Sequence, residues 1–68
     1  MKWNDIELPQ EAVGKISASH SDCCRYCIKR RGQFNYVLFI DGIAVSSHGQ
    51  HETLEQAKAE AERIKRIA

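Results

Sequence analysis

The chain lacks any long hydrophobic run. No apolar stretch reaches about 18 residues, which is the length that a membrane-spanning helix needs. The N-terminal segment Met1–Gln10 also lacks the basic region followed by an apolar region that a secretory signal peptide requires. We therefore expect a cytoplasmic protein that has no membrane among its partners.

The chain also has little net charge. Ten basic and nine acidic residues leave a formal charge of +1, so the composition as a whole indicates neither a polyanion-binding protein nor an acidic one. Only a local cluster of charge could support either function.

Size and missing motifs narrow the function further. With 68 residues and no repeat, low-complexity tract or linker, the sequence predicts a single domain over residues 1–68, near the lower size limit for folding without a metal, disulfide or partner. An enzyme-type pocket of roughly 300 Å³ or more would take up most of such a core. Because no catalytic motif is present either, we expect no enzyme, no small-molecule substrate and no cofactor.

The run from Phe34 to Val45 is rich in aromatic and β-branched residues and is interrupted by Asp41-Gly42. Asp-Gly between apolar alternations predicts a tight hairpin, because both central residues of the favoured turn need positive φ. Because side chains alternate along a strand, the even-numbered apolar residues of this run, among them Leu38, share one face. Val37 and Phe39 make the opposite face apolar as well. Unless something covers them, Val37 and Phe39 form a contact surface for a protein partner or for self-association. The even-numbered face consists of Phe34, Tyr36, Leu38 and Ile40.

An alanine-rich segment follows and predicts an amphipathic helix. Thr53 with Gln56 three residues later forms a capping box that marks the start of the helix. The apolar residues then recur at spacings of three and four, which places them in one stripe that faces the sheet. This stripe contains Leu54, Ala57, Ala61, Ile64 and Ala68.

Two further strands are predicted upstream, over Lys15–Ser21 and over about Cys23–Arg30, with turn chemistry at Ser21-Asp22 between them. Pro9 to Val13 suits a short helical turn that ends at Gly14. We therefore expect an α+β fold: a three-stranded antiparallel sheet, with four strands as the alternative, packed by one C-terminal helix and preceded by a short N-terminal segment.

The cysteines suggest a metal site. Cys24 and Cys27 form C-x-x-C, and His48 and His51 follow about twenty residues later, a set that could coordinate zinc tetrahedrally. Alternation along a strand would instead place the two cysteines on opposite faces. The other interpretation is therefore that Cys24 packs as a small core residue, while Cys23 and Cys27 remain reduced thiols on the other face.

A basic and aromatic segment suggests nucleic-acid binding. No acidic residue occurs from Arg25 to Ile40, so the cations there could neutralise phosphates while the rings stack on bases. A β-ribbon of this kind could also enter a major groove. The alternative is that the charges form the solvated face of a strand that must not pair with another chain. The candidate residues are Arg25, Lys29, Arg30, Arg31, Phe34 and Tyr36.

The run from Tyr26 to Val45, followed by Glu52–Glu62, resembles small bacterial and phage-encoded proteins that have a three-stranded antiparallel sheet and one C-terminal helix. It also looks like the sheet-plus-helix arm-binding domains of phage integrases. The resemblance implies a stand-alone accessory protein, including a phage-type inhibitor that blocks a host machine by occupying its surface. We therefore expect a non-catalytic protein that acts by protein–protein contact, with nucleic-acid binding through Arg25–Tyr36 as the alternative.

Overall fold

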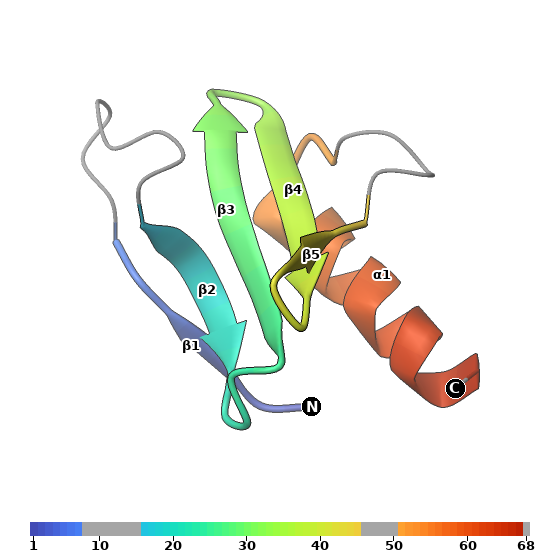
Figure 1. Cartoon of the computed structure of the whole chain (residues 1–68). Coiled ribbons are helices and arrows are strands. Elements are labelled where there is room, and N and C mark those ends of the chain that lie inside the picture. The colour runs from blue at the N-terminus through green and yellow to red at the C-terminus, as the bar shows by residue number, and fades with distance from the viewer. Residues whose placement is uncertain (8–15, 46–50, 68) are drawn as a thin grey trace.

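The computed structural model describes residues 1–7, 16–45 and 51–67. In these residues an antiparallel sheet packs against one helix (Figure 1). The strands run in the order β1-β2-β3-β4-β5, so each lies beside its neighbour in the sequence. The elements are β1 (Trp3–Asp5), β2 (Ser17–Ser21), β3 (Tyr26–Gly32), β4 (Asn35–Ile40), β5 (Ile43–Ala44) and α1 (Leu54–Ile67).

The predicted α+β class, with an antiparallel sheet and a C-terminal helix, is confirmed. The predicted number of strands is too low, because five strands pair in the described residues. The strand that the sequence did not suggest is β1, which pairs with β2 in the register Trp3↔Ser21 and Asp5↔Ser19. The helical turn predicted at Pro9–Val13 with its stop at Gly14 lies outside the described residues.

The hairpin between β4 and β5 forms where Asp41-Gly42 predicted it. Asp41 has a φ of 53° and Gly42 a φ of 81°, the positive values that this turn requires. The pairing continues beyond β5, since the backbone N–H of Val45 donates to the carbonyl oxygen of Leu38 at 2.8 Å.

The connection between β2 and β3 differs from the prediction. A turn follows Ser21, in which the Cys24 N–H donates to the Ser21 carbonyl oxygen at 2.9 Å and Cys24 has a φ of 59°. β3 therefore begins only at Tyr26, and the predicted strand start at Cys23 is wrong. The predicted core position of Cys24 is also wrong: the alternation that would have buried it does not extend into the turn, and the residue is exposed.

The core lies between α1 and the central strands β3 and β4. Its buried residues are Tyr26, Ile28, Leu38, Ala57 and Ala61, with Leu54 and Ile64 partly buried against them. The predicted helical stripe is confirmed for these four helix residues, and Ala68 lies outside the described part. Because alanine side chains are small, the helix approaches the sheet closely.

The start of α1 is capped as predicted, with one difference. The Gln56 N–H donates to Thr53 Oγ1 at 3.2 Å, which is the first half of a capping box. In the second half, Gln56 Oε1 accepts from the N–H of Glu52 at 3.0 Å, one residue before the expected donor. Two backbone donors at this end are therefore paired. In the described part of the chain no helix is both long and apolar enough to cross a membrane.

Candidate functional site

The sheet has one face covered by α1 and a second face that turns away from it (Figure 1). Ile28 and Leu38 point toward α1, so their neighbours on β3 and β4 point the other way. We call this second side the open face. Its central strand positions are His20, Cys27, Lys29, Arg31, Val37 and Phe39.

Phe39 lies beneath two cations on the open face. The Lys29 Nζ atom lies 5.1 Å from the centroid of the Phe39 ring, and the Arg31 Cζ atom lies 6.0 Å from it. Both cations come from β3, where the register shifts between Arg30 and Gly32. At exposed positions each such cation–π contact contributes about 0.5–1 kcal/mol. The predicted contact residues Val37 and Phe39 are both half-buried, so the chain's own cations form part of the cover over the ring.

The open face is positively charged. Its central strand positions carry no acidic residue, and no ion pair among the described residues involves Lys29 or Arg31. Asp5, by contrast, pairs with Lys58 of α1, with 2.8 Å between Lys58 Nζ and Asp5 Oδ1. A partner that meets the open face therefore meets cations next to an aromatic ring and Val37.

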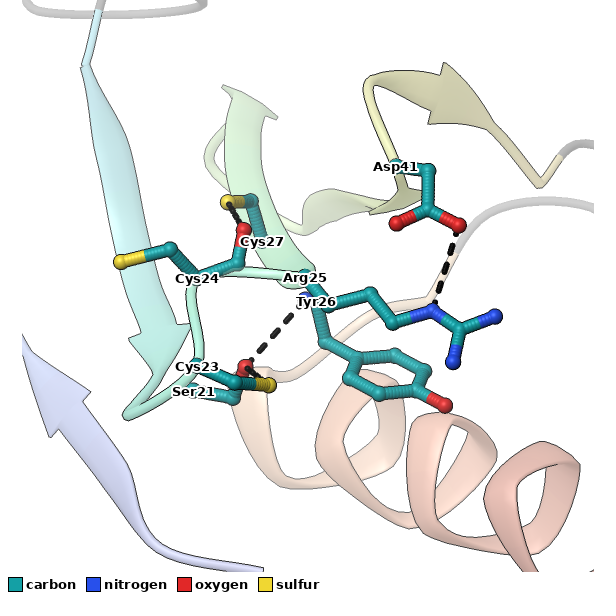
Figure 2. Close-up of polar contacts among 7 residues, drawn as sticks. All are labelled: Ser21, Cys23, Cys24, Arg25, Tyr26, Cys27 and Asp41. Carbon is teal, nitrogen blue, oxygen red and sulfur yellow. Dashed lines mark hydrogen bonds and ion pairs between the residues drawn. The ribbon is translucent and has the colours of Figure 1, made fainter.

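The residues of the predicted nucleic-acid patch do not form one surface. Arg25 lies in the turn before β3, where its Nε donates to Asp41 Oδ2 at 3.2 Å and its guanidinium lies over the Tyr26 ring (Figure 2). Arg30 pairs in register with Tyr36, whose ring packs against the core on the helix side. Phe34 lies in the turn between β3 and β4 and is 68% exposed. Only Lys29 and Arg31 of the predicted set reach the open face.

The predicted zinc set does not come together through His51. The His51 backbone pairs with Tyr36 near the start of β4, where the Tyr36 N–H donates to the His51 carbonyl oxygen at 2.7 Å. Cys24 lies at the other end of β4, because it comes just before Tyr26, which pairs with Ile40. The structure therefore places His51 and these cysteines at opposite ends of β4, and His48 lies outside the described residues. No three histidine, cysteine or acidic side chains within the described ranges are placed to hold a metal ion.

Cys23 lies on a different side of the β2–β3 turn from Cys24 and Cys27 (Figure 2). Its Sγ lies 3.3 Å from the hydroxyl oxygen of Ser21, which accepts a hydrogen bond from the Tyr26 N–H at 3.2 Å. The Ser21 hydroxyl proton can therefore point at the sulfur. Hydrogen bonds from this hydroxyl and then from the Arg25 backbone lower the pKa of the Cys23 thiol below its ordinary value.

Sequence reasoning placed Cys27 on the face opposite Ile28 but did not bring His20, Cys27 and Phe39 together on it. The signal that could have found them is cross-strand register: His20 pairs with Cys27, and Cys27 pairs with Phe39. These three side chains therefore form one row across β2, β3 and β4.

Comparison with protein-family models, curated proteins and solved structures finds no match to this chain. The class of this protein is therefore described by its architecture alone. It is a small α+β domain in which one helix covers one face of an antiparallel sheet.

Proposed function

We propose that this protein is a non-catalytic binding module that acts by protein–protein contact through the open face of its sheet. The observation that carries the proposal is the group formed by Val37, Phe39, Lys29 and Arg31 on the side away from α1. Aromatic residues and arginine are enriched at protein interfaces and among the side chains that dominate binding energy.

The charge of the open face specifies the chemistry of the partner. Lys29 and Arg31 contact the Phe39 ring and form no ion pair among the described residues, so their charges are free to meet carboxylates. Val37 and the ring would then meet an apolar side chain between those carboxylates. Such contact suits an accessory protein or a phage-type inhibitor that occupies an acidic surface of a larger assembly.

Nucleic-acid binding is the second candidate, because the same two cations flank an aromatic ring on a sheet face. A base could stack on Phe39 while Lys29 and Arg31 neutralise phosphates. Two neutralised phosphates on a single strand give a salt slope of only about −1.4 in log affinity against log salt. This electrostatic contribution is small because only two cations contribute to it, since Arg25 and Arg30 of the predicted patch lie away from the open face.

A pair of charge-matched variants tests the protein-contact proposal. Lys29→Glu with Arg31→Glu reverses two charges on the open face, and Lys65→Glu with Arg66→Glu reverses two on exposed helix positions. Wild-type protein and both variants are immobilised and exposed to extract from the source cells, with and without nuclease. We expect one protein that is retained by wild type and by the helix variant, lost with the open-face variant, and insensitive to nuclease. Equal retention by the two variants would contradict the proposal.

Fluorescence anisotropy with labelled single-stranded and duplex oligonucleotides tests the second candidate. Binding that weakens with salt and disappears only with the open-face variant would establish it in place of protein contact. If no oligonucleotide binds at low salt, nucleic acid is removed as a partner.

A further inference from the structure

A second group of reactive side chains lies at the end of the open face, beside the β2–β3 turn. His20 and Cys27 are directly opposite each other on β2 and β3, and Cys24 precedes β3 in the turn. Cys24 is exposed, and Cys27 is half-buried. Neither the proposed binding contacts nor the core uses these thiols.

The turn brings Cys24 and Cys27 close together. The Cys27 thiol is directed at the Cys24 carbonyl oxygen, with 3.8 Å between Sγ and O (Figure 2). That oxygen is separated from the Cβ of Cys24 only by the carbonyl carbon and Cα, so the two side chains start from neighbouring positions. The left-handed backbone of Cys24, with its φ of 59°, interrupts the alternation that would have placed the two thiols on opposite faces.

His20 provides a hydrogen-bond donor at the Cys24 sulfur. Its Nδ1 atom lies 3.1 Å from the Ser21 carbonyl oxygen, which can only accept, so Nδ1 carries the proton. The same nitrogen lies 3.9 Å from Cys24 Sγ, so its N–H is within hydrogen-bond reach of that sulfur. A change of the Cys24 side-chain rotamer then moves the sulfur from His20 toward Cys27.

We propose that Cys24 and Cys27 form an oxidation site at which a low-molecular-weight disulfide closes an intramolecular disulfide. The Cys24 thiolate, having released its proton to solvent, attacks one sulfur of the reagent, breaks its S–S bond and expels a thiolate. Cys27 then also releases its proton to solvent, and its thiolate attacks Cys24 Sγ and expels the second reagent thiolate. The protein pair loses two electrons, the reagent gains them, and both expelled thiolates take up protons from solvent.

Cys23 does not belong to this pair. Its side chain turns toward Ser21 on the other side of the turn, where no second thiol faces it among the described residues (Figure 2). Because its pKa is lowered, it also attacks the reagent, but the product stops at the mixed disulfide. Cys23 thus serves as an internal control: a thiol that reacts with the reagent but does not form an intramolecular disulfide.

Closure of the pair would regulate the open face, an extension that rests on the proposed function. Cys27 lies directly opposite Phe39, so a bond that pulls Cys27 toward the turn changes the surface beside the ring. We expect the oxidised protein to bind its partner more weakly than the reduced protein.

Intact-protein and peptide mass spectrometry after treatment with oxidised glutathione tests the site without any binding partner. In Cys23→Ser we expect the loss of two hydrogen masses and no adduct. In Cys24→Ser and in Cys27→Ser we expect two glutathione adducts and no closure. His20→Ala should close several-fold more slowly than wild type.

Three results would overturn the assignment. Closure in Cys27→Ser would mean that Cys23 and Cys24 pair, and closure in Cys24→Ser would mean that Cys23 and Cys27 pair. Two stable adducts in Cys23→Ser would mean that the thiols do not reach each other. An unchanged closure rate in His20→Ala would remove the histidine from the site. Because these readouts need no partner, they stand even if the proposed binding function fails.

Discussion

Ile28 and Leu38 are the largest fully buried side chains of the described residues, and they face each other across β3 and β4. The helix contributes two small residues, Ala57 and Ala61, to the same cluster. Few atoms therefore fill the centre of this protein. A single methylene removed there leaves a cavity that costs stability, since close-packed interiors relax only partly around it.

Ile28→Val should lower the free energy of unfolding by about 0.5–1.5 kcal/mol, because it removes one buried methylene group. The matched control is Ile43→Val, which makes the same chemical change at a side chain that is 72% exposed. We expect the control to stay within about 0.5 kcal/mol of wild type. Urea unfolding followed by circular dichroism measures both variants. Equal losses would show that Ile28 is not the packed centre.

At this scale the sequence predicts side-chain direction well inside strands and poorly in turns. Alternation placed Leu38 in the core and Val37 and Phe39 on the opposite face, as the structure has them. The same rule failed for Cys24, because a left-handed backbone is rare for cysteine and nothing in its neighbours requires it. It also did not reveal that Lys29 and Arg31 lie over Phe39, which depends on cross-strand register.

Among the elements, the β4–β5 hairpin depends on backbone conformation at one glycine. Gly42 has a φ of 81°, and a Cβ built there would meet nothing within 4 Å. Gly42→Ala should therefore destabilise the fold by about 1 kcal/mol through backbone strain alone.

Gly32→Ala is the control for this prediction. A Cβ at Gly32 would lie 3.5 Å from Asn35 Cβ, which is ordinary contact. We expect this variant to be as stable as wild type or slightly more stable, because alanine restricts the unfolded chain. Thermal unfolding compares the stabilities of the two variants. A larger loss of stability in Gly32→Ala than in Gly42→Ala would contradict the assigned conformation of the β4–β5 turn.

The start of α1 gives a second prediction for an element. Thr53→Ala removes the hydroxyl that accepts from the Gln56 N–H and should destabilise the protein by about 1 kcal/mol. Thr53→Ser keeps the acceptor and should restore most of that loss. Guanidinium unfolding, followed by the circular dichroism of the helix, measures the stability of wild type and both variants. If serine and alanine behave alike, the hydroxyl does not cap the helix.

The elements that the sequence predicted correctly are those with local chemical signals. Asp41-Gly42 identified its turn and Thr53 its helix start, because each motif satisfies its own backbone within a few residues. β1 has no such signal: it contains only three residues, and its pairing depends on β2 and α1, which are distant in the sequence. Its place in the sheet could not be predicted from Trp3–Asp5 alone.

In the whole molecule, β1 is joined to α1 by the pair of Asp5 and Lys58, which are 53 positions apart. Hydrogen bonds from Lys58 and then from the Ser19 hydroxyl lower the pKa of Asp5 below its ordinary value of 3.8. The unfolded chain therefore binds this proton more tightly than the folded protein does. The ionised carboxylate stabilises the fold above pH 3.8, and the contribution is lost as the pH falls through the lowered folded value.

Asp5→Asn tests this pH dependence. At neutral pH the variant should be less stable than wild type, and the difference should shrink toward zero at a pH well below 3.8. Because the Asp5 side chain is 56% exposed, only the direction of the effect is predicted. Urea unfolding midpoints of wild type and variant at both pH values measure this difference in stability. The other carboxylates are present in both proteins, so their effect cancels in the comparison. A difference of the same size at both values would contradict the role of the pair.

The candidate site was predictable only in part at this scale. The sequence indicated a basic and aromatic segment and the pair Val37 and Phe39, and both contribute to the open face. It did not show that Arg25 is paired with Asp41, or that Arg30 lies on the helix side with Tyr36. These placements depend on the turns and on the register shift near Gly32, which only the assembled sheet determines.

The order β1-β2-β3-β4-β5 also has a kinetic consequence. Each strand finds its partner in the next segment of chain, so most loops that close during folding are short and little entropy is lost before contacts form. We expect the central hairpin of β3 and β4 to nucleate folding and α1 to dock on it afterwards. Such a chain should fold rapidly for a β-rich domain, in a single exponential phase.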